Sequence, residues 1–180
     1  WAGKMLNISM VIIILVFSYA KKFYFRETVL LFAGKTFFFA FNLVISEGPF
    51  LFLLYFLFYF FHERFQNKIS SRHFVFYASA ILILLFTVRY SGIYIYLGTG
   101  VFWLWMLLRR RIFAFQKDIL KVLVVSGAGI IAYLGFNYFV YGSFTGEHLR
   151  GAPARIYPVY VLRNILAMVN IIDPFIGIKP

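Results

Sequence analysis

The side chains able to do acid–base or anion-binding chemistry are few in this 180-residue chain. It holds six carboxylates, three histidines and no cysteine. A disulfide framework, a thiolate metal site and a cysteine nucleophile are therefore excluded. The histidines, His62, His73 and His148, follow no HExxH or comparable spacing, so the sequence predicts no metal site built by the protein itself.

The carboxylates divide by their surroundings. Three lie beside clusters of lysine and arginine, and we expect them to be solvated partners of those cations: Glu27, Glu63 and Asp118. Glu47 lies in "SEGP" at 46–49, which predicts a helix start with Ser46 as N-cap. The helix dipole alone would favour Glu47 there. Glu147 lies in a polar loop and needs no role beyond a loop charge.

Two basic features are candidate binding sites for an anionic ligand. Arg89 interrupts "LLFTVRYSGIYIY" between two apolar runs. It either extends its head to the outer lipid headgroups or binds an anion such as phosphate, which suits the guanidinium fork. The loop at 142–158 adds His148, Arg150 and Arg155 on a backbone that glycines and Pro153 keep from being helical. It is either a phosphate-binding loop or an ordinary, unusually long connection.

Composition sets the class of protein that must position these residues. The chain is 63% hydrophobic and 23% aromatic, and 13% of it is charged, whereas soluble domains have about a quarter of their residues charged. This predicts an integral membrane protein. The net charge of +12 comes from short clusters between apolar runs, which indicates cytoplasmic loops and anionic lipid headgroups as partners rather than nucleic acid.

The apolar runs predict an all-α fold. Five are clear span candidates, at 5–20, 47–61, 74–88, 92–108 and 119–141. A sixth, 28–45, is interrupted by Gly34 and Lys35, and is either a broken crossing or one that packs Lys35 against protein. Residues 159–172 carry a narrow polar stripe, typical of an interfacial helix, or begin a seventh span. We expect one transmembrane domain over 1–180, a polytopic helical bundle of about five to seven spans.

Three basic clusters fix the expected orientation of these spans. They lie at 21–26, 64–72 and 109–117, and the positive-inside rule places them in the cytoplasm. If 28–45 crosses, alternation brings Glu47, Arg89 and the 142–158 loop to the extracytoplasmic face. Small residues on 119–141, among them Gly127, Gly129 and Gly135, further predict a close helix–helix contact.

Three motifs in order resemble the polytopic C-type glycosyltransferases, which include bacterial relatives of the protein mannosyltransferases. A Ser-Glu pair opens one span, an Arg-x-x-Gly turn joins two others, and an Asn-Tyr…Gly-Ser…Thr-Gly passage leads into an outer loop. The matching residues here are Ser46 and Glu47; Arg89 and Gly92; and Asn137, Tyr138, Gly142, Ser143, Thr145 and Gly146. The resemblance covers roughly residues 40–160.

The resemblance implies transfer of a sugar from a polyprenyl-phosphate donor on the extracytoplasmic face, in a bacterial inner membrane. It implies that Arg89, Arg150 and Arg155 bind the donor phosphate, that His148 supports this anion or the acceptor, and that Glu47 orients a sugar hydroxyl or satisfies the helix start. The resemblance requires no cofactor and leaves a divalent metal as the one possible candidate.

This chain departs from the family in one respect. The catalytic acidic residue of the first outer loop has no counterpart here, so the catalytic residue is unassigned. We expect the chain to be part of a longer one. The alternative is a noncatalytic accessory subunit of a larger membrane complex, with lipids, pigments or partner helices as ligands. A transporter or channel is less favoured, because no carboxylate lies well inside a span.

Overall fold

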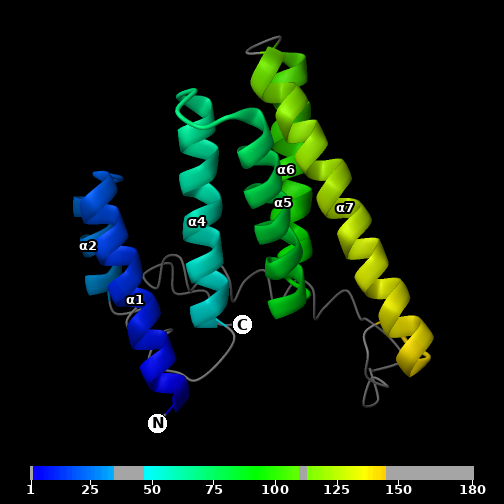
Figure 1. Ribbon diagram of the computed structural model, residues 1–180, viewed down its shortest axis with the longest axis horizontal. Coiled ribbons are helices and arrows are strands. Elements are labelled where there is room, and N and C mark those ends of the chain that lie inside the picture. Colours follow the sequence, from blue (N-terminus) through cyan, green and yellow to red (C-terminus); the bar gives the residue numbers. More distant parts are fainter. Residues whose placement is uncertain (1, 35–46, 110–112, 145–180) are drawn as a thin grey trace, which may run out of the picture. The chain divides into compact units, whose positions relative to one another are not determined.

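The computed structural model describes residues 2–34, 47–109 and 113–144, and all regular structure within these ranges is helical (Figure 1). The chain divides into two compact units, residues 1–133 and 134–180. The six described helices are α1 (Ala2–Lys21), α2 (Phe25–Ala33), α4 (Glu47–Phe65), α5 (Ser71–Val88), α6 (Gly92–Leu108) and α7 (Phe113–Tyr141).

Three of these helices are long and apolar enough to cross a membrane: α1, α5 and α7. The predicted all-helical fold is therefore confirmed for the described residues, and these three helices support the predicted membrane class. The predicted spans 47–61 and 92–108 are also helical, as parts of α4 and α6. The apolar helix α6 is shorter, with 17 residues, and α4 ends in the charged sequence "HERF".

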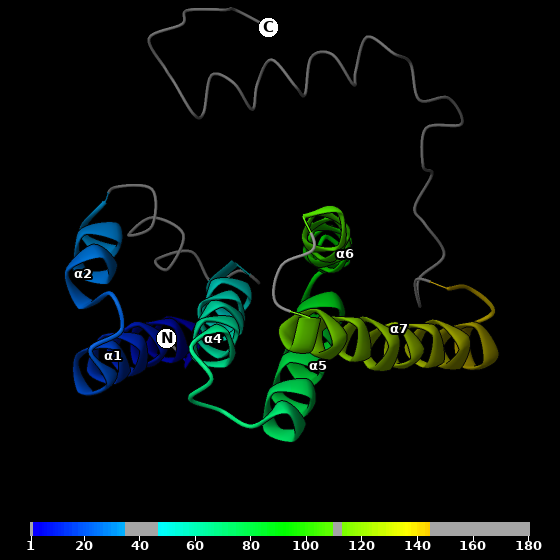
Figure 2. The same cartoon turned by 90° about the horizontal axis from the view of Figure 1, so that it is seen from above.

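The core of unit 1–133 lies where α4, α5, α6 and α7 meet. Its fully buried side chains include Phe74, Leu82 and Ile119. Figure 2 shows α1 and α2 on one side of α4, with α5 and α6 on its other side. Many large apolar side chains point outward instead, as Val124 does with 64% of its surface exposed. Apolar surface on this scale requires a lipid environment or a partner to cover it.

Small residues allow α7 to approach its neighbours closely. A side chain added at Gly127 would meet the Tyr96 hydroxyl of α6 at 2.7 Å, and one added at Gly129 would overlap the Ile83 side chain of α5. The predicted close contact of this helix is therefore confirmed at two glycines. Gly135 has no neighbour of this kind among the described residues.

Helices α1 and α4 run in the same direction. Near their starts the Asn7 side chain lies against Gly48, and near their ends the Phe23 ring contacts Tyr59 and His62, with ring centroids 5.2 and 5.1 Å apart. The chain between them must therefore return from one end of the pair to the other.

The described part of this return is α2, nine residues that end at Ala33. Gly34 follows in an extended conformation (φ −66°, ψ 135°). The run 28–45 is therefore interrupted at Gly34, as its sequence indicated, and is no single continuous helix. Lys35 and the rest of the run lie outside the described residues.

Candidate functional site

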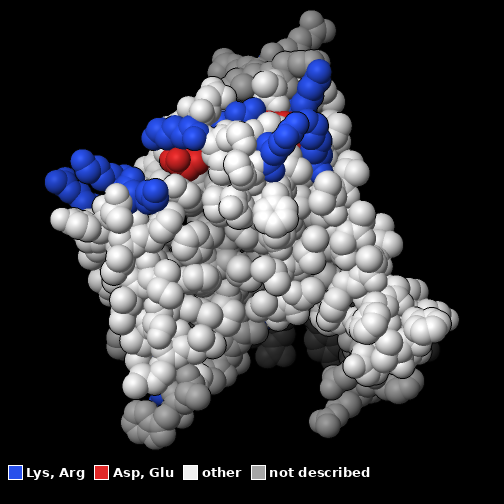
Figure 3. Space-filling model, in the orientation of Figure 1, with Lys and Arg blue, Asp and Glu red and all other residues white. Residues whose placement is uncertain are grey.

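Most basic residues in the described part of unit 1–133 gather at one end of its helices (Figure 3). This is the end where α1 and α4 finish, where α5 and α7 begin, and where α6 finishes. The cations near it come from all three predicted clusters: Lys21, Lys22, Arg26, Arg64, Lys68, Arg72, Arg109, Lys117 and Lys121. Their common location is the pattern expected of a cytoplasmic end.

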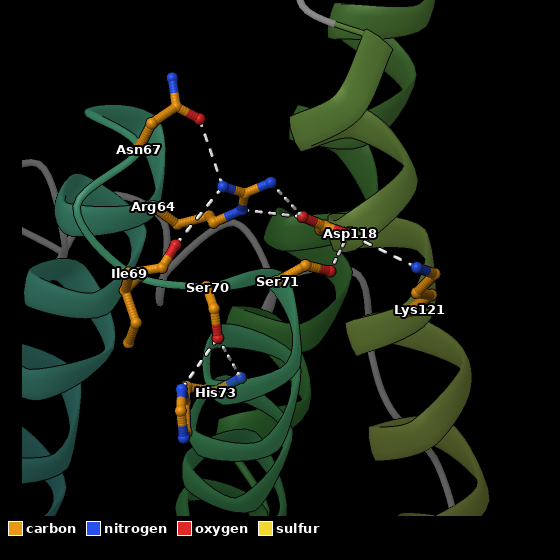
Figure 4. Close-up of polar contacts among 8 residues, drawn as sticks. All are labelled: Arg64, Asn67, Ile69, Ser70, Ser71, His73, Asp118 and Lys121. Atoms are coloured by element: carbon orange, nitrogen blue, oxygen red, sulfur yellow. Dashed lines mark hydrogen bonds and ion pairs between the residues drawn. The ribbon is translucent and has the colours of Figure 1, made fainter.

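One carboxylate lies buried among these cations and connects three helices (Figure 4). Asp118 of α7 accepts hydrogen bonds from Arg64 Nε of α4 at 2.8 Å and from Ser71 Oγ of α5 at 2.6 Å. Arg64 Nη2 lies 2.7 Å from the same carboxylate, and Lys121 Nζ lies 3.6 Å from it. Arg64 also donates to the Ile69 carbonyl at 3.4 Å.

This arrangement corrects the expectation that Asp118 is solvated, because Asp118 is only 3% exposed. The short connection between α4 and α5 and the start of α7 converge here, and a buried carboxylate requires charged or hydrogen-bonding partners. The cluster holds α4, α5 and α7 together at the basic end. Glu63 is closer to the predicted solvated partner of a cation, since it pairs at 3.9 Å with Lys68, whose side chain is 58% exposed.

The opposite end of the α4–α5 pair brings together two residues of the predicted site. Glu47 is the first residue of α4, and Arg89 follows the last residue of α5. Because these helices are antiparallel neighbours, the two side chains meet although they are far apart in sequence. Arg89 Nη1 donates to Glu47 Oε1 at 2.5 Å, with the side chains 38% and 32% exposed. Glu47 Oε2 is buried and has no hydrogen-bond partner among the described residues.

The backbone around this ion pair is tightly packed. The Arg89 N–H donates to the Leu85 carbonyl at 3.1 Å, and the Gly92 N–H donates to the Arg89 carbonyl at 2.8 Å. A side chain at Gly92 would lie 2.5 Å from backbone atoms of Leu85, so only glycine fits. The Arg-x-x-Gly turn thus has a structural reason, namely to start α6 directly against the last turn of α5.

A third helix adds a polar residue next to this pair. Asn7 of α1 is 2% exposed, and its side chain lies where a side chain at Gly48 would be, 2.5 Å from that position. Gly48 thus admits the Asn7 amide beside the start of α4. In the sequence Asn7 is a polar residue early in an apolar run, which does not identify its neighbour.

The ion pair differs from the two roles predicted for Arg89, which were contact with outer headgroups or binding of an anionic ligand. Glu47 lies in the first turn of its helix as predicted. Topology alone had placed Glu47 and Arg89 at the same end of the helices, but only the neighbouring position of α4 and α5 makes them partners. Ser46, the predicted N-cap, lies outside the described residues.

The described part of the Asn-Tyr…Gly-Ser motif, in unit 134–180, ends α7. Gly142 has φ 69°, a left-handed conformation that favours glycine, and its N–H donates to the Tyr138 carbonyl at 2.9 Å. The Tyr138 ring stacks on Phe144 with centroids 4.8 Å apart, and Asn137 Nδ2 donates to the Phe144 carbonyl at 3.4 Å. These residues fix the chain direction as it leaves the helix.

The remaining predicted site residues, His148, Arg150 and Arg155, lie outside the described residues, as does the predicted helix at 159–172. Among the residues that the structure does describe, no group of three or more His, Asp or Glu side chains is placed to hold a metal ion. Comparisons of the chain with protein-family models, with curated proteins and with solved structures each find no match.

Proposed function

We propose that this chain is part of an integral-membrane glycosyltransferase that takes a sugar from a polyprenyl-phosphate donor on the extracytoplasmic face. One observation carries the proposal: Glu47 and Arg89, each from a motif of the sequence resemblance, form one ion pair at the end of α4 and α5 opposite the basic clusters. With the basic end in the cytoplasm, this pair and the 142–158 loop lie on the extracytoplasmic side of a bacterial inner membrane.

Arg89 is suited to hold the donor phosphate. Its guanidinium has five N–H donors in a fixed fork, and one carboxylate oxygen of Glu47 does not exhaust them. Glu47 keeps the guanidinium in place, and the family resemblance also implies that it orients a sugar hydroxyl or satisfies the helix start. The family resemblance implies the same role, binding or supporting the donor phosphate, for His148, Arg150 and Arg155.

An apolar groove supports binding of the donor's isoprenoid chain. It has a volume of about 450 Å³ between α4 and α6 and is lined mainly by apolar side chains, among them Leu54, Phe58, Tyr94 and Phe102. Tyr94 lies in the first turn of α6, close in sequence to Arg89. A chain lying in this groove would place its phosphate near the level of the ion pair.

Binding of a polyprenyl monophosphate to the purified full-length protein tests the proposal, with the uncharged polyprenol as the matched ligand. We expect Arg89→Ala to weaken binding of the phosphate form to the level of the alcohol. Glu47→Gln, which frees the guanidinium from its carboxylate, should retain or strengthen binding. Equal binding of alcohol and phosphate by the unmodified protein, or unchanged phosphate binding after Arg89→Ala with the unfolding transition preserved, would refute it.

The second candidate is a noncatalytic accessory subunit of a membrane complex. It is favoured by the use of three of the four described carboxylates in ion pairs within the protein: Glu47 with Arg89, Glu63 with Lys68, and Asp118 with Arg64. Such pairs stabilise helix packing and leave few acids for catalysis. Copurification with a stoichiometric membrane partner, together with no preference for polyprenyl phosphate over polyprenol, would select this candidate.

A further inference from the structure

A second groove lies between α5 and α7 and begins at the basic end. It has a volume of about 480 Å³ and is polar at its mouth, where Ser71, Arg72 and Lys121 line it. Beyond the mouth its walls are mainly apolar and include Val75, Phe76, Ala80, Ile83 and Val125. From residue 71 to residue 83 it follows roughly 18 Å of helix.

The mouth of this groove carries a net positive charge. Arg64, Arg72 and Lys121 bring three positive charges against the single negative charge of Asp118. Arg64 is committed to Asp118 through two nitrogens, at 2.8 and 2.7 Å. Lys121 lies farther from Asp118, at 3.6 Å, and its side chain is 61% exposed. Arg72 forms no ion pair with a carboxylate among the described residues. Two cations therefore remain to meet an anion at this position.

We infer that this groove binds one anionic phospholipid of the cytoplasmic leaflet, with its phosphate between Arg72 and Lys121 and one acyl chain along α5. A phosphate group complements the two cations at the mouth. The apolar walls are what distinguish a lipid from free phosphate, because a soluble anion gains nothing from Val75, Phe76 or Val125. This inference is independent of the proposed sugar transfer, which concerns the other end of the helices.

The site is also placed where such a lipid would lie. Phe76 is 68% exposed and Val125 is 48% exposed, so the groove opens on the outer surface of the helices rather than into their core. The cations stand at the end that the positive-inside rule assigns to the cytoplasm, where anionic lipids are attracted to basic side chains.

Native mass spectrometry of the purified full-length protein with added phosphatidylglycerol or phosphatidylcholine tests the inference. We expect one phosphatidylglycerol to be retained preferentially. Each basic side chain near an anionic surface contributes about fivefold to binding, so Arg72→Gln with Lys121→Gln should weaken retention about twenty-five-fold. Lys21→Gln with Lys68→Gln removes the same charge at the same end outside the groove and is the matched control. It should have little effect.

Two further measurements distinguish a lipid seated in the groove from a soluble anion held by charge alone. Ala80→Phe fills the groove without changing charge and should also weaken retention, while thermal unfolding shows that the variant is folded. Inorganic phosphate in large excess should not displace the lipid. Equal retention of both lipids, equal losses in the control and groove variants, or displacement by phosphate alone would overturn the inference.

Discussion

Removing the carboxylate of Asp118 should destabilise the protein more than removing any exposed charge. In Asp118→Ala, Arg64 loses the two contacts at 2.7 and 2.8 Å, and its side chain is only 13% exposed. Ser71 loses the acceptor of its 2.6 Å hydrogen bond. The variant therefore leaves a cation and a hydroxyl in a largely buried position without their partner.

These contacts determine the expected loss in the free energy of unfolding. Breaking a buried ion pair from one side costs about 3–5 kcal/mol, and an unmet hydroxyl adds about 1 kcal/mol. Arg64 retains Asn67 Oδ1 at 3.2 Å and the Ile69 carbonyl at 3.4 Å as acceptors, which reduces the loss. We therefore expect the free energy of unfolding to fall by about 3 kcal/mol.

Denaturant unfolding in detergent micelles, followed by far-UV circular dichroism, measures this loss. Glu63→Ala is the matched control, because its pair with Lys68 spans 3.9 Å with an exposed partner and should cost about 0–1 kcal/mol. Replacing both partners, as Arg64→Met with Asp118→Leu, should recover most of the stability. Equal losses for Asp118→Ala and Glu63→Ala, or a double variant less stable than Asp118→Ala, would refute the reasoning.

Three glycine substitutions test the packing near the candidate site. Gly92→Ala should lower the free energy of unfolding by about 1–3 kcal/mol, because the new side chain meets backbone. Gly98→Ala in the same helix is the control. Its side chain meets nothing within 4 Å, so the substitution should be neutral or stabilising. Gly48→Ala should destabilise by a similar amount, and adding Asn7→Ala should relieve part of the loss; a fully additive pair would contradict their contact. Gly142→Ala should cost about 1–2 kcal/mol through its positive φ, and an unchanged unfolding transition would show that the left-handed turn is absent.

Most of the helices could be predicted from the sequence, because each of the five clear apolar runs lies within one helix. The runs 74–88 and 119–141 both lie within helices of spanning length. Gly34 was also recognised as an interruption, since glycine followed by lysine is unfavourable in mid-span. Such features are local, and local composition suffices to find them.

The lateral partners of the helices could not be predicted in this way. Asp118 was expected to be solvated because its neighbours in sequence are basic, yet its main partners come from α4 and α5. Glu47 was expected to favour the helix start or orient a sugar hydroxyl, and Arg89 to reach lipid headgroups or bind an anion. Neither sequence position specifies the other. Which helix lies beside which depends on packing among similar apolar faces, and that information is spread over the whole core.

The orientation of the helices is the most direct test of this account, and a chain without cysteine suits it. Ser91, beside the ion pair, and Gln66, at the basic end, are both exposed, and each can be replaced by a single cysteine. With a membrane-impermeant thiol reagent on intact cells, we expect labelling at Ser91→Cys and labelling of Gln66→Cys only after permeabilisation. The reverse pattern would place Glu47 and Arg89 in the cytoplasm and contradict a role in extracytoplasmic sugar transfer.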